Sequence, residues 1–349
     1  DGSSASDYFD KKGTSTNAFT TFDYTAYEIY GSNDIMGDVN HLIDFVQDKY
    51  ITKQIVDNEK GIITEEVRMD KNNPSHKMYF NVLKTLYNTN NRKYEITGLE
   101  KDVEEITKKE LDLVYDSFYN PENMFIVITG NFNPYEMSLM IKENQNKKKF
   151  KKVKVKKIYD KEESNVNKDY LLLKENIEIP KVSMSYKMPR KKFKDYNDFT
   201  LRLYLSTILN ANFGATSTLK EELLDKNLVL SLSYFTIVDK DNVVLTISLE
   251  TKYPNEIINI IDDYMDKLSI NEDNLIRRSK CNIADFIIGF DDIEFINSLI
   301  QNDIINYNKI INNRYDIFKD LNINEAKKIL KVIDISNRSI VVMEPNKKD

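Results

Sequence analysis

Two glutamates, Glu59 and Glu66, lie seven residues apart in the stretch NEKGIITEEVRMD, residues 58–70. At the α-helical advance of about 100° per residue, they fall within roughly 20° of each other on one helix face. The same arc carries apolar side chains: Ile55, Val56, Ile62, Ile63 and Val67. A carboxylate placed among apolar side chains loses its hydration and needs a cation, hydrogen-bond donors or a proton. Taken alone, the pattern fits either a functional site or two core glutamates neutralised by Lys or Arg from a neighbouring helix.

The composition is that of a globular protein with about two domains. The chain has 349 residues, of which 41% are hydrophobic and 30% charged, and a net charge of −6. That charge argues against nucleic acid as the main partner. No apolar run approaches the roughly 20 residues that span a membrane. The single cysteine, Cys281, excludes an intramolecular disulfide and favours a reducing, cytoplasmic location.

A change of composition divides the chain. Eight lysines lie between Lys147 and Lys157, and acidic residues follow them. Such a run is usually a solvated linker, although it could also bind an anionic partner. We therefore expect an N-terminal half over residues 1–145, a charged linker over 146–165 and a C-terminal half over 166–349.

Local patterns predict several elements of the first half. Residues 14–31 alternate β-branched and aromatic side chains, which predicts two strands joined by a tight turn. A helix is expected from after Thr52 to near Pro74, with Gly61 closely packed. The apolar run Phe125–Thr129 predicts a strand, and Thr107 with Glu110 matches a capping box. The two histidines, His41 and His76, fit surface positions better than ligand positions.

The second half repeats the order of the first. The strand predicted at Val243–Glu250 is followed by an amphipathic helix, as residues 24–31 are followed by VNHLIDFVQDKYI. In this register Glu59 and Glu66 correspond to Ser279 and Phe286. The second copy thus keeps the scaffold pattern without the carboxylates, which makes a purely architectural role for them less favoured. The predicted fold is α+β, with two homologous α/β-sandwich half domains whose mostly antiparallel sheets are covered by helices.

The sequence resembles the insulinase/pitrilysin family of zinc metallopeptidases, and in particular its bacterial processing-peptidase-like members. The segments that carry the resemblance are NAFT followed by TAY, EKGIITEEVRM, NPENMFIVITGNF, the charged linker and the degenerate second half. The resemblance implies a zinc site in which Glu66 matches a metal ligand. It implies that Glu59 matches a glutamate that supports the catalytic site. It also implies that Asn17, Ala18 and Phe19 match an edge strand, to which an extended peptide substrate adds by main-chain pairing.

The family's inverted zinc motif, H-x-x-E-H, supplies two histidine ligands and the glutamate that activates water. This sequence contains only His41 and His76, and neither lies in such a motif. In the family the motif would fall a few residues before Asp1, so we expect that the sequence lacks its N-terminal segment. One carboxylate cannot replace the three protein ligands of a catalytic zinc site. The chain alone is therefore predicted to be metal-free and inactive.

A second departure concerns the C-terminal half. Many relatives place an arginine and, seven residues later, a tyrosine after a Gly/Ser-rich turn, and these residues grip the substrate. Here Leu224 and Leu230 lie near those positions, so either Tyr234 or another group serves, or this half only forms walls.

The leading hypothesis is a zinc-dependent peptidase that hydrolyses peptides bound as an added strand between two half-shells. The alternative is a catalytically inert homologue that binds peptides or pairs with an active peptidase subunit. Either a homodimer or a heterodimer with a homologous subunit is consistent with the resemblance. Nucleic-acid binding through the lysine run is a weak third hypothesis, because the rest of the chain is acidic.

Overall fold

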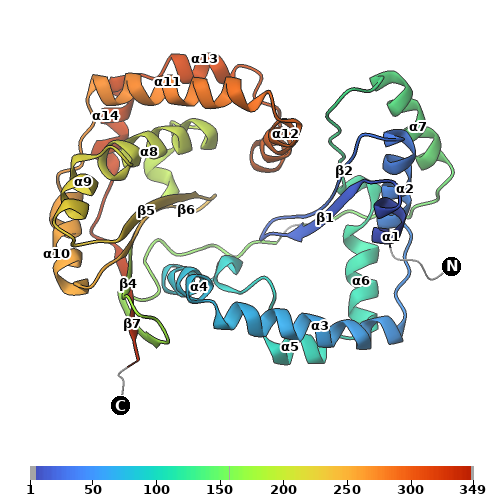
Figure 1. The fold of residues 1–349 in the computed structure, drawn as a ribbon, viewed down its shortest axis with the longest axis horizontal. Helices are drawn as coiled ribbons and strands as arrows, with labels where there is room; N and C mark the ends of the chain where they lie inside the picture. Colours follow the sequence, from blue (N-terminus) through green and yellow to red (C-terminus); the bar gives the residue numbers. More distant parts are fainter. Residues whose placement is uncertain (1–4, 157, 347–349) are drawn as a thin grey trace. The chain divides into compact units, whose positions relative to one another are not determined.

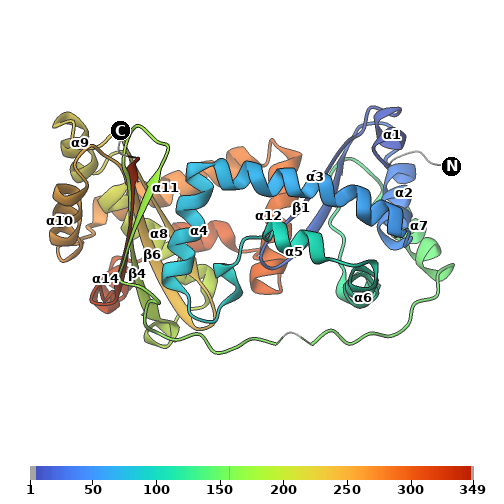
Figure 2. The same ribbon diagram turned by 90° about the horizontal axis from the view of Figure 1, so that it is seen from below.

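The computed structural model describes residues 5–156 and 158–346, which form an α+β fold (Figures 1 and 2). Two compact units are present. We call residues 1–69 and 95–158 the N-unit, and residues 70–94 and 159–349 the C-unit. The sequence divides the chain near residue 145, whereas in the structure the segment Asp70–Tyr94 packs with the C-unit.

The N-unit contains a β-hairpin followed by helices. β1 (Ser15–Thr20) pairs antiparallel with β2 (Thr25–Tyr30), which confirms the predicted pair of strands. Contacts join the hairpin to the helices on either side of it in the sequence. The helices that begin in this unit are α1 (Ala5–Asp10), α2 (Ile35–Gln47), α3 (Lys53–Asn72), α5 (Glu100–Glu105), α6 (Lys108–Phe118) and α7 (Pro134–Asn146). A 3₁₀ turn covers Pro121–Asn123. The capping box of Thr107 and Glu110 at the start of α6 is present as predicted.

The strand predicted at Phe125–Thr129 is not formed, so that prediction is wrong. Phe125 and Ile126 are about half exposed. The described sheet of the N-unit consists of β1 and β2 paired with each other. An apolar run becomes a regular strand only where a neighbouring strand forms a ladder with it, and periodicity does not show whether that neighbour is present.

The C-unit is built on a five-stranded sheet with the order β3-β7-β4-β6-β5. β3 and β7 are parallel, and the other neighbouring pairs are antiparallel. The strands are β3 (Tyr170–Glu175), β4 (Lys181–Pro189), β5 (Ser231–Val238), β6 (Asn242–Glu250) and β7 (Arg338–Pro345). The predicted strand at Val243–Glu250 is thereby confirmed as β6.

Helices cover both faces of this sheet (Figures 1 and 2). One face packs on α8 and α10, and the other face packs on α4, which contacts β3, β4 and β7. The helices of this unit are α4 (Pro74–Leu86), α8 (Asp198–Phe213), α9 (Thr218–Asp225), α10 (Pro254–Met265), α11 (Glu272–Gly289), α12 (Ile293–Tyr307), α13 (Arg314–Lys319) and α14 (Ile323–Val332). Short 3₁₀ turns cover Asn91–Lys93 and Arg190–Phe193.

The hydrophobic core cluster formed by the described residues belongs to the C-unit. In β4, Val182, Met184 and Tyr186 point into this core, because alternate residues of a strand face opposite sides of the sheet. The N-unit instead leaves large apolar side chains exposed, including Leu113 on α6 and Tyr135 on α7.

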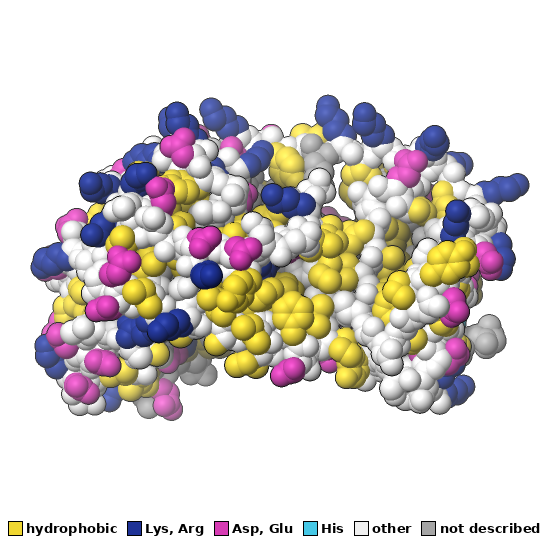
Figure 3. Space-filling model, turned by 90° about the horizontal axis from the view of Figure 1, so that it is seen from above, with side chains coloured by type: hydrophobic (Ala, Val, Ile, Leu, Met, Phe, Trp, Pro, Cys, Tyr) yellow, Lys and Arg dark blue, Asp and Glu magenta, His cyan; other side chains and the backbone are white. Residues whose placement is uncertain are grey.

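The described residues between 148 and 169 contain neither helix nor strand, and most of their lysines are exposed, as expected for a linker. Glu162, in the same stretch, is buried. On the face shown in Figure 3, Lys and Arg side chains are interspersed with Asp and Glu. Within the residues that the structure describes, no helix is both long enough and apolar enough to cross a membrane.

Candidate functional site

The two glutamates lie on α3, which runs from Lys53 to Asn72 and confirms the predicted helix. The hydroxyl of Thr52 accepts a hydrogen bond from the backbone N–H of Ile55, at 3.2 Å, and so occupies one of the free N–H groups at the helix start. Two long side chains connect α3 to α5. Lys60 Nζ donates to the carbonyl oxygen of Glu104 at 2.7 Å, and Arg68 Nε donates to the carboxylate of Glu100 at 3.1 Å.

Both glutamates are exposed, so the expectation that they lie in a desolvated apolar stripe is wrong. The buried side of α3 is marked by Val56 and Val67. These valines lie roughly 60–100° around the helix from the nearer glutamate. The apolar arc of α3 is wide enough to include both the valines and the glutamates. The sequence alone does not show which side of this arc packs against other residues and which side is exposed.

The glutamates share their side of α3 with exposed apolar residues. Ile55, Ile62 and Met69 follow each other at seven-residue spacing and are 37%, 59% and 71% exposed. This spacing brings them close to one helix face, next to the two glutamates. We call these five residues the α3 face. Large apolar side chains that gather with charged ones on an exposed face are typical of a surface that binds another segment.

Gly61 does not have the close neighbour that the sequence predicts. A Cβ at this position would have no atom within 4 Å among those it could meet, and the residue is exposed. The glycine therefore marks no tight helix contact within the described residues.

The described residues do not form a metal site by themselves. Among them, no three His, Cys, Asp or Glu side chains gather closely enough to hold a metal ion. His41 stacks on Tyr8, with ring centroids 3.6 Å apart, and His76 Nδ1 lies 3.6 Å from Asp70 Oδ1. Since a catalytic zinc ion takes three protein ligands, the carboxylate of Glu66 supplies only one donor of such a set.

The residues predicted to bind substrate lie on β1 of the same unit. Asn17 and Ala18 are exposed, and Phe19 is half-buried with its ring 5.8 Å from that of Tyr24. β1 pairs with β2 on one side, and the described sheet ends at these two strands. Each of the two strands is thus an edge strand within the described residues, and the role of Asn17, Ala18 and Phe19 in binding stays a prediction.

The corresponding positions of the second copy have a packing role. Ser279 Oγ on α11 donates to the carbonyl oxygen of Phe318 at 2.6 Å. Phe286 packs edge-on against Phe318, with centroids 6.0 Å apart. At the positions that correspond to the two exposed glutamates, the second copy thus has a serine and a phenylalanine that contact Phe318 on α13.

The residues near the family's arginine and tyrosine positions differ in environment. Leu224 and Leu230 are exposed, and Tyr234 is partly buried against the core, with its hydroxyl accepting from Asn210 Nδ2 at 3.1 Å. The hydroxyl of Tyr234 therefore already has a hydrogen-bond partner within the C-unit.

Comparison with family models gives the class of the protein. A model described as "Insulinase (Peptidase family M16)" matches residues 2–100, and one described as "Peptidase M16 inactive domain" matches residues 105–280. The chain belongs to the insulinase family, peptidase family M16. The suspected resemblance is thereby confirmed.

Individual relatives agree with this assignment. A Bacillus subtilis protein named "Uncharacterized zinc protease YmfH" is 35% identical over 224 residues, which are 63% of this chain and 52% of that protein. The chain thus spans about half the length of this relative. "Zinc protease PqqE" of Helicobacter pylori is 22% identical over 321 residues, which cover 83% of this chain and 68% of that protein.

Among solved structures, a putative M16-like peptidase from Alicyclobacillus acidocaldarius matches with a TM-score of 0.88 and 25% identity. The match covers 97% of this chain and 82% of that one. A protease from Helicobacter pylori has the same fold, with a TM-score of 0.84 at 19% identity. The predicted α+β fold with two related halves is therefore confirmed.

Proposed function

We propose that this chain forms part of a zinc-dependent peptidase, in which Glu66 is a metal ligand and Glu59 supports it. The observation that carries the proposal is the α3 face, where both carboxylates are exposed and alternate along the helix with the exposed apolar residues Ile55, Ile62 and Met69. Relatives named zinc proteases support the reaction class.

The remaining ligands would come from outside residues 1–349, because no H-x-x-E-H occurs in the printed sequence. A polypeptide that carries this motif on an amphipathic helix could cover Ile55, Ile62 and Met69 and bring its histidines to Glu66. When bound, zinc acts as a Lewis acid on a peptide carbonyl and activates water. Glu66 would contribute negative charge to the ion, and Glu59, about two turns away, would orient neighbouring groups through hydrogen bonds.

We propose that β1 holds the substrate. An extended peptide paired with the outer edge of β1 would be read mainly through its main chain, at Asn17, Ala18 and Phe19. Such recognition tolerates many side chains, which fits a peptidase of broad specificity.

The test is peptide hydrolysis after the motif is supplied. The chain is combined with a polypeptide bearing H-x-x-E-H, fused or co-expressed, and assayed with a quenched fluorescent peptide library with and without zinc. We expect zinc-dependent cleavage that Glu66→Gln abolishes and Glu65→Gln retains, since Glu65 is exposed elsewhere on α3 and pairs with Arg68. Full activity of the Glu66→Gln variant would refute the assignment.

A second candidate is an inert homologue that binds peptides or pairs with an active subunit. The match of residues 105–280 to a model described as an inactive domain is compatible with this candidate. It predicts peptide binding without hydrolysis, and no zinc binding, even after the motif is supplied.

A further inference from the structure

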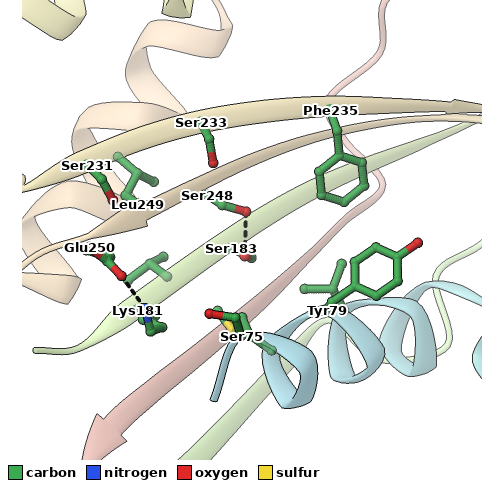
Figure 4. A pocket seen from close by; sticks show the side chains of 13 residues that line it. Ser75, Tyr79, Lys181, Ser183, Ser231, Ser233, Phe235, Ser248, Leu249 and Glu250 are labelled. Carbon is green, nitrogen blue, oxygen red and sulfur yellow. Dashed lines mark hydrogen bonds and ion pairs between the residues drawn. The ribbon is translucent and has the colours of Figure 1, made fainter. Parts of the chain in front are cut away.

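The C-unit contains a groove on one face of its sheet. Its volume is about 240 Å³, and it runs between α4 and the sheet face formed by β4, β6 and β5 (Figure 4). α4 packs over β3, β4 and β7. The groove therefore lies at the edge of the area that α4 covers, next to β5 and β6. Neither Glu59 nor Glu66 lines it.

The middle of the groove is lined by serine hydroxyls. Ser183, Ser248 and Ser233 form one row across three adjacent strands, since Ser248 is opposite Ser183 on one side and Ser233 on the other. The hydroxyls of Ser183 and Ser248 are hydrogen-bonded at 2.8 Å (Figure 4). Ser233 is exposed and bears a hydroxyl that can both donate and accept. Small polar side chains leave room above the sheet for a ligand with amide groups.

One end of the groove is charged. Lys181 and Glu250 are opposite each other in the sheet and form an ion pair beside Ser231. The Glu250 side chain is 37% exposed, compared with 21% for Lys181, so the carboxylate is the more accessible partner. The hydrogen bond from Lys181 holds the pKa of Glu250 below its usual range. A carboxylate has about four lone-pair positions and can accept from a further cation.

The opposite end is aromatic. The rings of Tyr79 on α4 and Phe235 on β5 have centroids 6.1 Å apart and planes inclined at 55°. Tyr79 is 39% exposed, so part of its ring remains open to a ligand. Aromatic and large aliphatic side chains gain most from packing against such a pair.

The outer edge of β5 is partly blocked. Lys220 Nζ donates to the carbonyl oxygen of Leu232 at 2.9 Å, and the guanidinium of Arg202 donates to the carbonyl oxygen of Val238. Main-chain acceptors occupied in this way do not pair with an incoming strand. A ligand of this region is therefore held by the groove face rather than by strand addition along β5.

We propose that this groove binds an extended peptide segment, with an aromatic or large aliphatic side chain at Tyr79 and Phe235 and a basic side chain at Glu250. The choice of a peptide as ligand rests on the proposed function. The spacing follows from β5, where Ser231 at the charged end and Phe235 at the aromatic end are four residues apart on the same sheet face. At about 3.3 Å per residue the two ends are roughly 13 Å apart, so the two side chains should be four positions apart. The volume is below the roughly 300–1,000 Å³ of sites for drug-sized ligands, as suits a few side chains.

The test is fluorescence anisotropy with the 349-residue chain and no zinc. The probes are the fluorescein-labelled peptide Gly-Phe-Ser-Gly-Ser-Arg-Gly and the same peptide with Phe and Arg exchanged, because the direction of binding is not specified by the side chains. We expect saturable binding of at least one probe, weakened about tenfold or more by Ser233→Phe, which fills the groove, and by Tyr79→Ala or Glu250→Gln. Tyr253→Ala and Glu256→Gln alter exposed residues outside the groove and should leave binding unchanged.

Absence of binding by both probes, or binding that Ser233→Phe leaves unchanged, would overturn the proposal. Equal binding of a peptide in which Phe and Arg are adjacent would also overturn it. Because zinc is absent throughout and Glu66 is not involved, failure here is distinguishable from failure of the proposed peptidase activity.

Discussion

Replacing Glu162 by glutamine should destabilise the C-unit, because this carboxylate is buried and fully engaged. It forms an ion pair with Lys187 on β4 at 2.7 Å, and both side chains are at most 1% exposed. Its oxygens also accept the backbone N–H groups of Asn88, Thr89 and Asn90 at 2.7–2.8 Å. The contacts tie the residues after α4 and the end of the linker to the sheet.

The size of the effect follows from the pKa of Glu162. Burial alone would raise this pKa, but the N–H of Asn88, the ammonium of Lys187 and the two following N–H groups outweigh it and lower the pKa to about 2. A decrease of about 2.5 units below the ordinary value corresponds to about 3 kcal/mol of folding free energy. Removing one partner of a buried pair typically costs about 3–5 kcal/mol. We therefore expect Glu162→Gln to lower the free energy of unfolding by about 3 kcal/mol at pH 7.

The pH dependence has a defined sign. A carboxyl whose pKa is lowered by folding stabilises the protein above its unfolded pKa, and this stabilisation is lost as the pH falls through the folded pKa. The difference between the native chain and Glu162→Gln should thus be largest above about pH 4.5 and shrink towards pH 2. Below that pH the side chain at position 162 is neutral in both the native chain and the Glu162→Gln variant.

The assay is native-state hydrogen exchange of peptides from β4 and β6, which reports the opening free energy of the C-unit. Glu163→Gln is the matched control, because Glu163 is exposed next to the buried residue, and it should change stability by less than about 0.5 kcal/mol. Lys187→Met should also destabilise, and the double variant should lose less than the sum of the two single losses. A loss below about 1 kcal/mol for Glu162→Gln, or strict additivity, would refute the reasoning.

Three further outcomes follow from the structure. Gly61→Ala should raise the free energy of unfolding by about 0.5–1 kcal/mol in chemical denaturation, because an alanine favours the helix and its Cβ would meet no atom within 4 Å; a decrease would contradict the described environment. Thr107→Ala should lower the protection of α6 from hydrogen exchange by about 1 kcal/mol, because it removes the hydroxyl that accepts from the Glu110 N–H. The control Thr16→Ala, at an exposed threonine, should have no effect on α6. Brief trypsin treatment should cut first between Lys151 and Lys156, where the chain is exposed and lacks helix and strand, and first cuts inside α8 would contradict this.

The parts of the fold that depend on local pattern could be predicted from the sequence. The β1–β2 hairpin, α3, the capping box of α6 and β6 were all predictable, because alternation, helical periodicity and capping residues act over a few positions. The strand expected at Phe125–Thr129 depended on a neighbouring strand, and the expected packing of Gly61 depended on a neighbouring helix. Neither neighbour can be inferred from the segment itself.

The candidate site could likewise be predicted only where it depends on local pattern. The seven-residue spacing places Glu59 and Glu66 on one side of α3, but their exposure depends on which side of the helix is covered. The buried pair of Lys187 and Glu162 was not predicted, because Glu162 lies in a stretch whose composition is that of a solvated linker. The available signal was a lysine within the apolar strand VSMSYKMP, since a buried lysine requires a carboxylate partner.

The proposed role of Glu66 as a metal ligand is tested most directly by a measurement of metal affinity. The chain is combined with a polypeptide bearing H-x-x-E-H and titrated with cobalt(II), whose visible absorption reports the coordination of a substituted zinc site. We predict one tetrahedral site per chain, with affinity reduced at least about tenfold by Glu66→Gln and unchanged by Glu65→Gln. The same affinity and spectrum for Glu66→Gln and the native chain would contradict the claim.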